Sequence, residues 1–129
     1  MKFSVVIYSA PYTSEAAASA LRFSETLISE GHDIYRLFFF SDGVHNANKL
    51  AVTPQDEVNL QAAWDELITS NKLDSVVCVS SAIKRGILDD NEARKHELSS
   101  ESLKPSFKIA GLGQLVDAYI NSDRVINFG

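Results

Sequence analysis

The sequence holds one side chain of strong intrinsic nucleophilicity, the thiol of Cys78. Cys78 lies at the end of the apolar run Val76–Val79, and Ser80 and Ser81 follow, a pattern typical of a buried strand that leads into a helix. Backbone N–H groups and the positive end of the helix dipole favour a thiolate at such a place. That thiolate can attack a sulfur electrophile or hold a transferable sulfur as a persulfide. Position alone favours the alternative, a small apolar core residue, because free cysteine is among the most buried residue types.

Three other titratable residues could contribute to chemistry at Cys78 or could have only structural roles: Lys84, Arg85 and His45. Lys84 and Arg85 follow in the same predicted helix, where they add positive potential near the thiol or stabilise the end of that helix. His45 is a candidate proton donor, but no acidic residue stands at a fixed spacing from it, so no triad is predicted. We therefore assign catalysis to Cys78 alone.

No motif for a metal or a bound nucleotide accompanies this thiol. His32, His45 and His96 lack metal-ligand spacing, and a single cysteine excludes a multi-cysteine zinc site. Gly111–Val116 begins like a dinucleotide-binding loop, but Val116 stands where the third glycine belongs. We expect no metal and no cofactor; a flavin or small-molecule binder stays open as an alternative function.

Length and composition describe one globular domain spanning residues 1–129. The chain is 45% apolar and 22% charged, enough apolar material to build a core. Its net charge of −5 repels phosphate groups, so we expect no direct binding of nucleic acid and no membrane partner. A single cysteine excludes an internal disulfide and fits a reducing cytoplasm. The interrupted apolar run Phe3–Ile7 is too short for a secretory signal and is predicted to be the first strand.

Apolar residues along the chain switch between the periodicities of strands and helices. The strands are expected at Lys2–Ser9, Asp33–Phe40, Asp74–Val79, Phe107–Ala110 and Arg124–Phe128.

Caps, glycine stops and apolar stripes predict helices between these strands. The first helix is capped by Thr13 or Ser14 and ends at Gly31. The second is opened by Thr53-Pro54, after a polar loop over Val44–Val52. Further helical segments are expected from Ser80 or Ser81 to Arg85 before Gly86, near Asn91–Lys95, and over Gly111–Ser122 with Leu112, Leu115, Val116 and Tyr119 inward.

Alternating strands and helices, with strands that are apolar on both faces, imply a parallel sheet covered by helices. We predict an α/β protein with a single flavodoxin-like three-layer domain and a five-stranded, mainly parallel sheet. Ligands and reactive groups of such sheets gather at the carboxyl ends of the strands. Four segments are expected to meet there: Ala10–Tyr12, Ser41–His45, Cys78–Ser81 and Gly111–Gly113.

Three segments resemble the DsrE/TusD family of sulfurtransferases, and the resemblance extends in order over essentially the whole chain. They are Cys78–Gly86 around the cysteine, Phe38–Asn48 at the end of the second strand, and Gly111–Phe128 as the last helix and strand. The resemblance implies a sulfurtransferase subunit of a cytoplasmic sulfur relay that ends in 2-thiolation of the wobble uridine of tRNA. Cys78 would accept sulfane sulfur from a TusA-like donor, hold it as a persulfide, and pass it to a TusE-like carrier.

The resemblance also implies partners. The family assembles as a dimer of heterotrimers, a heterohexamer, in which TusB- and TusC-like subunits join the cysteine-bearing one. A single thiol at an exposed sheet edge suits sulfur handover, because a second neighbouring thiol would resolve the persulfide to a disulfide. Two alternatives stay open: a non-catalytic scaffold subunit of the same kind of complex, and a DsrE-type subunit in dissimilatory sulfur oxidation.

Overall fold

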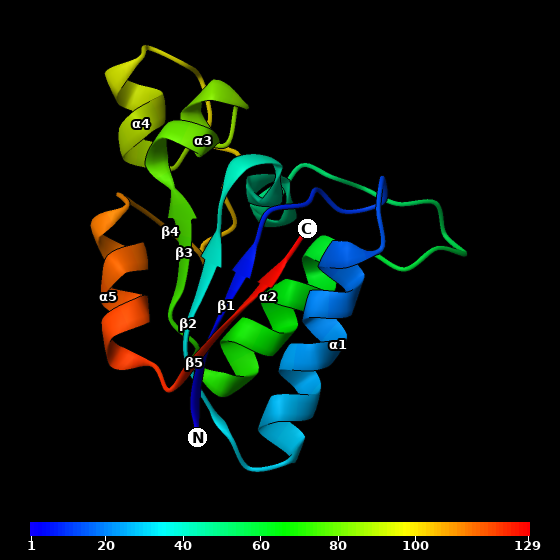
Figure 1. Ribbon diagram of the computed structural model, residues 1–129. Coiled ribbons are helices and arrows are strands. Elements are labelled where there is room, and N and C mark those ends of the chain that lie inside the picture. The colour runs from blue at the N-terminus through cyan, green and yellow to red at the C-terminus, as the bar shows by residue number, and fades with distance from the viewer.

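The computed structural model describes residues 1–129, and its centre is a sheet of five parallel strands (Figure 1). The strands are β1 (Lys2–Ile7), β2 (Asp33–Phe39), β3 (Ser75–Cys78), β4 (Lys108–Ala110) and β5 (Arg124–Phe128). Their order across the sheet is β4-β3-β2-β1-β5, and every neighbouring pair is parallel. The five predicted strands are confirmed, each to within two residues.

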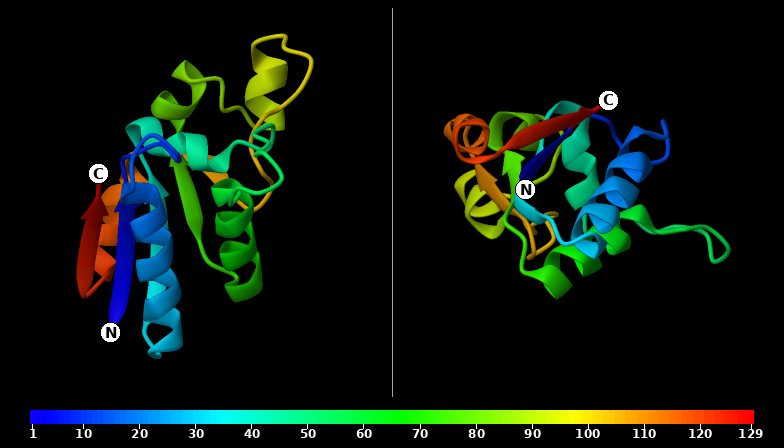
Figure 2. Two further views of the ribbon diagram at one scale, coloured as in Figure 1. Left: turned by 90° about the vertical axis from the view of Figure 1, so that its right-hand side faces the viewer. Right: turned by 60° about the horizontal axis from the view of Figure 1, so that its bottom comes forward.

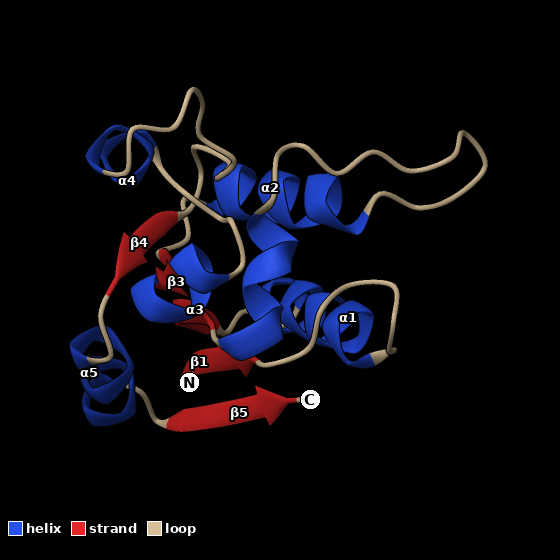
Figure 3. Ribbon diagram, turned by 90° about the horizontal axis from the view of Figure 1, so that it is seen from above, coloured by secondary structure: helices blue, strands red, loops and turns tan.

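Helices cover both faces of the sheet, which confirms the predicted three-layer α/β domain. The helices α1 (Ala16–Ser29) and α2 (Leu60–Asn71) lie on one face, and α5 (Gly113–Asn121) lies on the other (Figure 3). The short helices α3 (Val79–Lys84) and α4 (Asp90–Lys95) lie beyond the carboxyl ends of the strands (Figure 1). Flavodoxin has the strand order 2-1-3-4-5, whereas this sheet has β2 at its centre and β5 beside β1.

The pleat of β2 divides its apolar side chains between two cores. Leu37 and Phe39 join the larger core, in which the ring of Phe39 meets Trp64 of α2 edge to face, with centroids 5.2 Å apart. Phe38 faces the other side and packs against Val6 in the smaller core, which α5 covers through Leu115. The run of apolar residues at the end of β2 is therefore buried on both faces, as its sequence predicts.

The first helix begins later than its predicted caps. Thr13 makes no capping hydrogen bond, and Glu15 precedes the helix without capping it. Ser14 acts as a partial cap, because its Oγ accepts a hydrogen bond from the N–H of Ala16 over 3.3 Å. At the other end, Gly31 has a φ of +84°, the left-handed conformation that ends the helix and turns the chain into β2.

The prediction that Thr53-Pro54 opens the second helix is wrong, since α2 begins at Leu60. Asn59 caps it by accepting a hydrogen bond from the N–H of Ala62 over 3.0 Å. The hydroxyl of Tyr12, distant in sequence, accepts a second one from the N–H of Leu60 over 2.9 Å. Residues 48–59 instead form a long connection that projects from the side of the molecule (Figure 2).

Part of the predicted loop over residues 44–52 is helical. A 3-10 helix, η1 (Ser41–Ala47), packs across the carboxyl edge of the sheet. Gly43 lies directly against the carbonyl of Ile7 at the end of β1, where a Cβ atom has no room. Asn46 is fully buried, and its Nδ2 donates to the carbonyl oxygens of Ser9 and Gly43 over 3.1 and 2.9 Å. These contacts between distant segments, rather than helix propensity, shape η1.

The orientation of α5 differs from the predicted one. Leu115 packs on the sheet and Ala118 is buried, but three residues expected to face inward are at least half exposed: Leu112, Val116 and Tyr119. Ile120 extends this apolar surface and is 75% exposed. When apolar residues lie on both sides of a helix, their spacing in the sequence does not show which side packs on the sheet. Tertiary packing determines which face of α5 is buried.

Candidate functional site

Cys78 is the last residue of β3 and the residue that precedes α3. The predicted caps of this helix, Ser80 and Ser81, lie inside its first turn, and no side chain caps it. The helix ends as expected before Gly86, whose φ is +75°. The strand-to-helix turn predicted for Cys78 is therefore present, but the helix begins two or three positions earlier than a serine cap would place it.

Cys78 is buried, as its position in the sequence favours, and the expectation of a thiol at an exposed sheet edge is wrong. Cys78 is 1% exposed and packs against Val6, Phe38 and Val76 on the side of the sheet that α5 covers. The half-buried Phe40 also packs against this cluster. Position at the sheet edge thus does not make the sulfur accessible, because side chains from β1, β2 and β3 enclose it.

Burial and hydrogen bonding act on the Cys78 thiol in opposite directions. Burial disfavours the thiolate and so raises its pKa. The backbone N–H groups and hydroxyls of Ser81 and Ser80 favour the thiolate, and they hold the pKa below the ordinary value of a cysteine. The Oγ atom of Ser80 lies 3.7 Å from the sulfur. The thiol is therefore buried, yet it ionises more readily than an ordinary cysteine.

Four residues tie η1 to α3 beside the thiol, and we call them the η1–α3 clamp: Ser41, Asp42, Ser81 and Arg85. The N–H of Ser41 donates to Oγ of Ser81 over 3.0 Å. Nε of Arg85 donates to Asp42 over 2.8 Å, and its NH1 group donates to the carbonyl of Ser81 over 3.2 Å. The hydrogen bond from Arg85 also lowers the pKa of Asp42.

The two basic residues of α3 therefore have different positions. Arg85 is engaged in the η1–α3 clamp and stabilises the last turn of its helix, the structural role that the sequence left open. Lys84 is exposed on α3. The sequence predicted that Ser41–His45 lies near Cys78–Ser81, but it did not identify the bonds that Ser41 and Asp42 make with α3, since a Ser-Asp-Gly run signals only a turn.

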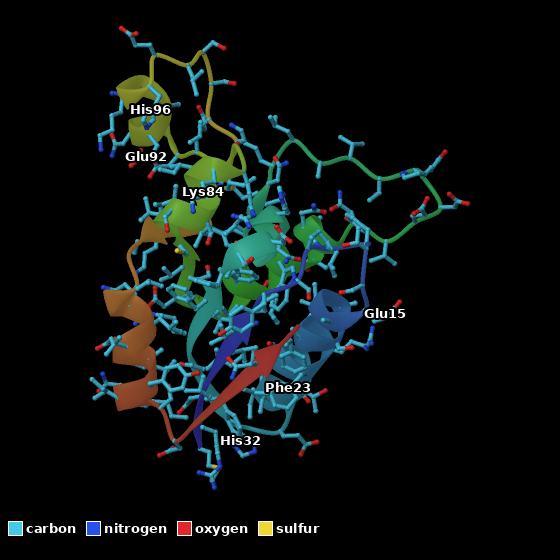
Figure 4. The ribbon with its side chains drawn as sticks, turned by 45° about the horizontal axis from the view of Figure 1, so that its top comes forward. Glu15, Phe23, His32, Lys84, Glu92 and His96 are labelled. Carbon is cyan, nitrogen blue, oxygen red and sulfur yellow. The ribbon has the colours of Figure 1, made fainter.

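The three histidines belong to different parts of the fold. His96 directly follows α4 and lies beside Glu92 of that helix, at the end of the molecule that holds α3, whereas His32 lies at the opposite end (Figure 4). His45 belongs to η1, at the carboxyl edge of the sheet, and its carbonyl accepts a hydrogen bond from Gln61. No group of three His, Cys, Asp or Glu side chains is placed to hold a metal ion.

The predicted gathering of segments at the carboxyl edge is partly confirmed. Ser41 and Ser81 meet directly, and Cys78 pairs with Ala110, the residue before the Gly111–Gly113 segment. Tyr12 instead turns toward α2. None of the four surface cavities, of about 280 to 320 Å³, is lined by Cys78. None of these cavities therefore gives access to the thiol.

No helix of the protein has the length and apolar character needed to cross a membrane.

The fold and the site together define a class: an α/β protein with a parallel sheet, whose single cysteine lies between the third strand and the helix that follows it. The chain belongs to the DsrE/DsrF-like family, whose model matches residues 1–128. The resemblance drawn from three sequence segments is thereby confirmed.

Curated relatives match along essentially the whole chain. The sulfurtransferase TusD homolog of Pseudomonas aeruginosa is 45% identical over 100% of this chain and 98% of its own length. The putative sulfurtransferase DsrE of Allochromatium vinosum is 43% identical, over 100% of this chain and 99% of its own. The sulfurtransferase TusD of Salmonella dublin is 39% identical, over 99% and 100%.

Solved structures share the fold. The ychN protein of E. coli superposes with a TM-score of 0.79 at 25% identity, covering 99% of both chains. The Methanobacterium thermoautotrophicum protein MTH1491, a protein of unknown function, superposes with a TM-score of 0.65 at 12% identity, over 98% of this chain and 97% of its own. The arrangement of layers and strands is therefore that of a recurring fold.

Proposed function

We propose that the protein is a sulfurtransferase subunit that carries sulfur as a persulfide on Cys78. The observation that carries the proposal is the placement of its single thiol at the start of α3, where hydrogen bonds from Ser81 and Ser80 lower the thiol pKa despite burial. Membership of the DsrE/DsrF-like family supports the same reaction, since relatives of full length are named sulfurtransferases.

The proposed reaction is two successive thiolate attacks without net oxidation. The Cys78 thiolate attacks the terminal sulfane sulfur of a donor persulfide; the sulfur–sulfur bond of the donor breaks, and the donor leaves as a thiolate. A new sulfur–sulfur bond now holds the sulfane sulfur on Cys78. An acceptor thiolate then attacks that sulfur, and Cys78 leaves as the thiolate with which it began. One cysteine suffices for both steps.

The partners follow from the family resemblance. We propose a TusA-like donor and a TusE-like acceptor, with TusB- and TusC-like subunits in a cytoplasmic dimer of heterotrimers that serves 2-thiolation of the tRNA wobble uridine. The net charge of −5 favours protein carriers over direct contact with tRNA. A sulfur-oxidation role is the alternative, and the nearly equal identities of 45% and 43% to a TusD homolog and to a DsrE do not separate the two.

Burial favours a second candidate function. A cysteine that is 1% exposed and packed among Val6, Phe38 and Val76 fits a scaffold subunit whose neighbour carries the transferred sulfur. In the carrier function the enclosing side chains must move apart when a partner docks. In the scaffold function Cys78 stays unreactive in the folded, assembled complex.

Incubation with a persulfide-loaded donor distinguishes these functions. We expect the assembled protein to gain about 32 Da on Cys78, located by peptide mapping, and to lose it to an acceptor carrier. We expect the Cys78→Ser and Cys78→Ala variants to fold and to gain nothing. A folded, partner-assembled wild-type protein without the adduct would contradict the carrier function and support the scaffold.

A further inference from the structure

A groove lies between α3 and the segment that follows α4, at the end of the molecule where Lys84 and His96 lie (Figure 4). Its volume is about 290 Å³, and no residue of the η1–α3 clamp lines it. We call it the α3–α4 groove. It is lined by six residues: Ile83, Lys84, Gly86, Leu88, His96 and Leu98.

The lining of the α3–α4 groove combines apolar side chains with one unpaired positive charge. Ile83 and Leu98 are 38% and 52% exposed, so apolar atoms are open to a partner here. Lys84 is exposed and takes part in none of the ion pairs of the protein. No carboxylate lines the groove, and the nearby Glu92 lies 3.6 Å from His96. The groove is therefore complementary to an apolar side chain that has a carboxylate beside it.

The α3–α4 groove is built on the helix that begins at the nucleophile. Cys78 directly precedes α3, and Lys84 is the last residue of that helix. At about 1.5 Å per residue, six positions place Lys84 about 9 Å along the helix axis from Cys78. Even a transient interface of about 500 Å² on each partner spans more than that distance. A protein that brings its own thiol to the Cys78 sulfur therefore also covers the groove.

The size of the α3–α4 groove fits a transient partner better than a permanent subunit. Obligate interfaces bury about 2,000 Å² or more in total, whereas transient encounters bury less than about 1,200 Å². A hollow lined by six residues holds one anchoring side chain of such a small interface. A carrier that must leave after each transfer needs an anchor of this kind.

We propose that the α3–α4 groove is a docking site for sulfur carrier proteins, which fill it with an apolar side chain flanked by a carboxylate. The carboxylate pairs with Lys84, and the apolar side chain packs between Ile83 and Leu98. This inference rests on the proposed function, because it names the surface that recognises the partners of that reaction. Since the donor and the acceptor must each reach the Cys78 sulfur, both use the groove in turn.

The test measures docking without sulfur transfer. The assembled protein is titrated in a calorimeter with the TusA-like donor and, separately, with the TusE-like acceptor, both reduced and free of sulfane sulfur. We expect Lys84→Glu and Leu98→Asp each to raise the Kd of both carriers roughly tenfold. The effect of Lys84→Glu should shrink at high salt, because it acts through charge. The matched controls are Lys72→Glu and Val58→Asp, the same kinds of change at exposed residues outside the groove, which should leave the Kd unaltered.

Absence of binding to the wild-type protein, an unaltered Kd in both groove variants, or an equal rise in the controls would overturn the inference. A rise for one carrier alone would contradict shared docking. If Leu98→Asp instead disperses the assembly in light scattering, the groove is a subunit contact and the inference is wrong.

Sulfur loading, measured separately, distinguishes failure of this inference from failure of the proposed function. Equal loading rates in wild type, Lys84→Glu and Leu98→Asp would contradict the groove alone. Binding that depends on the groove, in a protein that never loads, would support the groove and contradict the proposed function.

Discussion

At the scale of single residues, tight packing against neighbouring segments determines the surroundings of both Cys78 and Gly43. Cys78 is enclosed by apolar side chains, and its thiol keeps a lowered pKa only because Ser81 and Ser80 supply hydrogen bonds inside that enclosure. Gly43 sits against the backbone of β1 with no space for a side chain. Since Gly43 lies between Ser41 of the clamp and the rest of η1, its fit also determines how η1 meets α3.

We expect Gly43→Ala to destabilise the protein by about 3 kcal/mol, because the new methyl group overlaps the carbonyl of Ile7 and backbone must move. Denaturant unfolding monitored by the single tryptophan, Trp64, measures this loss. The matched control is Gly113→Ala at the start of α5, where an added Cβ meets nothing within 4 Å; it should stabilise the protein by about 0.5 kcal/mol. Equal stability of the two variants would contradict this prediction and show that the backbone of η1 shifts at little cost to make room for the methyl group.

At the scale of elements, one buried arginine decides how α5 lies on the sheet. Arg36 of β2 faces the α5 side, and its Nε donates to Asp74 over 2.7 Å. Its NH1 group donates to the carbonyl of Gln114 and to the carboxylate of Asp117, both over 2.8 Å. Because a guanidinium holds several donors in one plane, a single side chain joins β2, the start of β3 and α5.

We expect Arg36→Ala to cost about 1–3 kcal/mol, because Asp74, Asp117 and the carbonyl of Gln114 each lose a donor. Amide hydrogen exchange should accelerate in α5 before it does in α1. Arg36→Lys keeps the positive charge but loses the planar set of donors of the guanidinium, so its loss of stability should be intermediate. Unaltered exchange in α5 of Arg36→Ala would mean that apolar packing alone holds this helix.

The same cluster predicts a pH dependence. Burial raises the pKa of Asp74, but hydrogen bonds from Lys108 and Arg36 outweigh it, while those from Tyr35 and Arg36 lower the pKa of Asp117. A lowered carboxyl pKa contributes stability that is fully present above the ordinary value near 4 and is lost as the pH falls through the lowered value. The stability difference between wild type and Arg36→Ala should therefore shrink in acid.

At the scale of the whole molecule, α5 presents an apolar surface that the fold does not cover. Leu112, Val116, Tyr119 and Ile120 are each at least half exposed, whereas the one acidic residue of the helix, Asp117, is paired with Arg36. An exposed apolar face with little charge is typical of a surface that meets another protein. It supports the proposed assembly with TusB- and TusC-like subunits and gives that assembly a candidate contact.

We expect Ile120→Asp to weaken assembly with co-expressed partner subunits by roughly thirtyfold or more, as a charge placed in an apolar interface does. Light scattering coupled to size-exclusion chromatography measures the assembled fraction. Val52→Asp is the matched control, because Val52 is 88% exposed on the connection between η1 and α2, away from α5. Disassembly by Val52→Asp alone would place the contact on that connection instead.

The sequence by itself determined the layers of this protein and its chemical centre. Strand and helix periodicities are local signals, so five strands and two-sided helical cover follow from apolar spacing alone. The single thiol at the end of the third strand follows in the same way, because the continuous apolar run Val76–Val79 is succeeded by two serines, a pattern that predicts a strand leading into a helix. Glycine stops at Gly31 and Gly86 are equally local, since a left-handed residue ends each helix.

Tertiary structure alone decided how accessible and how ionised that thiol is. The residues that enclose Cys78 come from three strands, and Ser81 is anchored by Ser41, whose left-handed backbone has no sequence signature. The start of α2 depends on the Tyr12 hydroxyl, and the exposed side of α5 depends on Arg36. In each case the deciding contact joins residues far apart in the chain, and such contacts exist only once the sheet has formed.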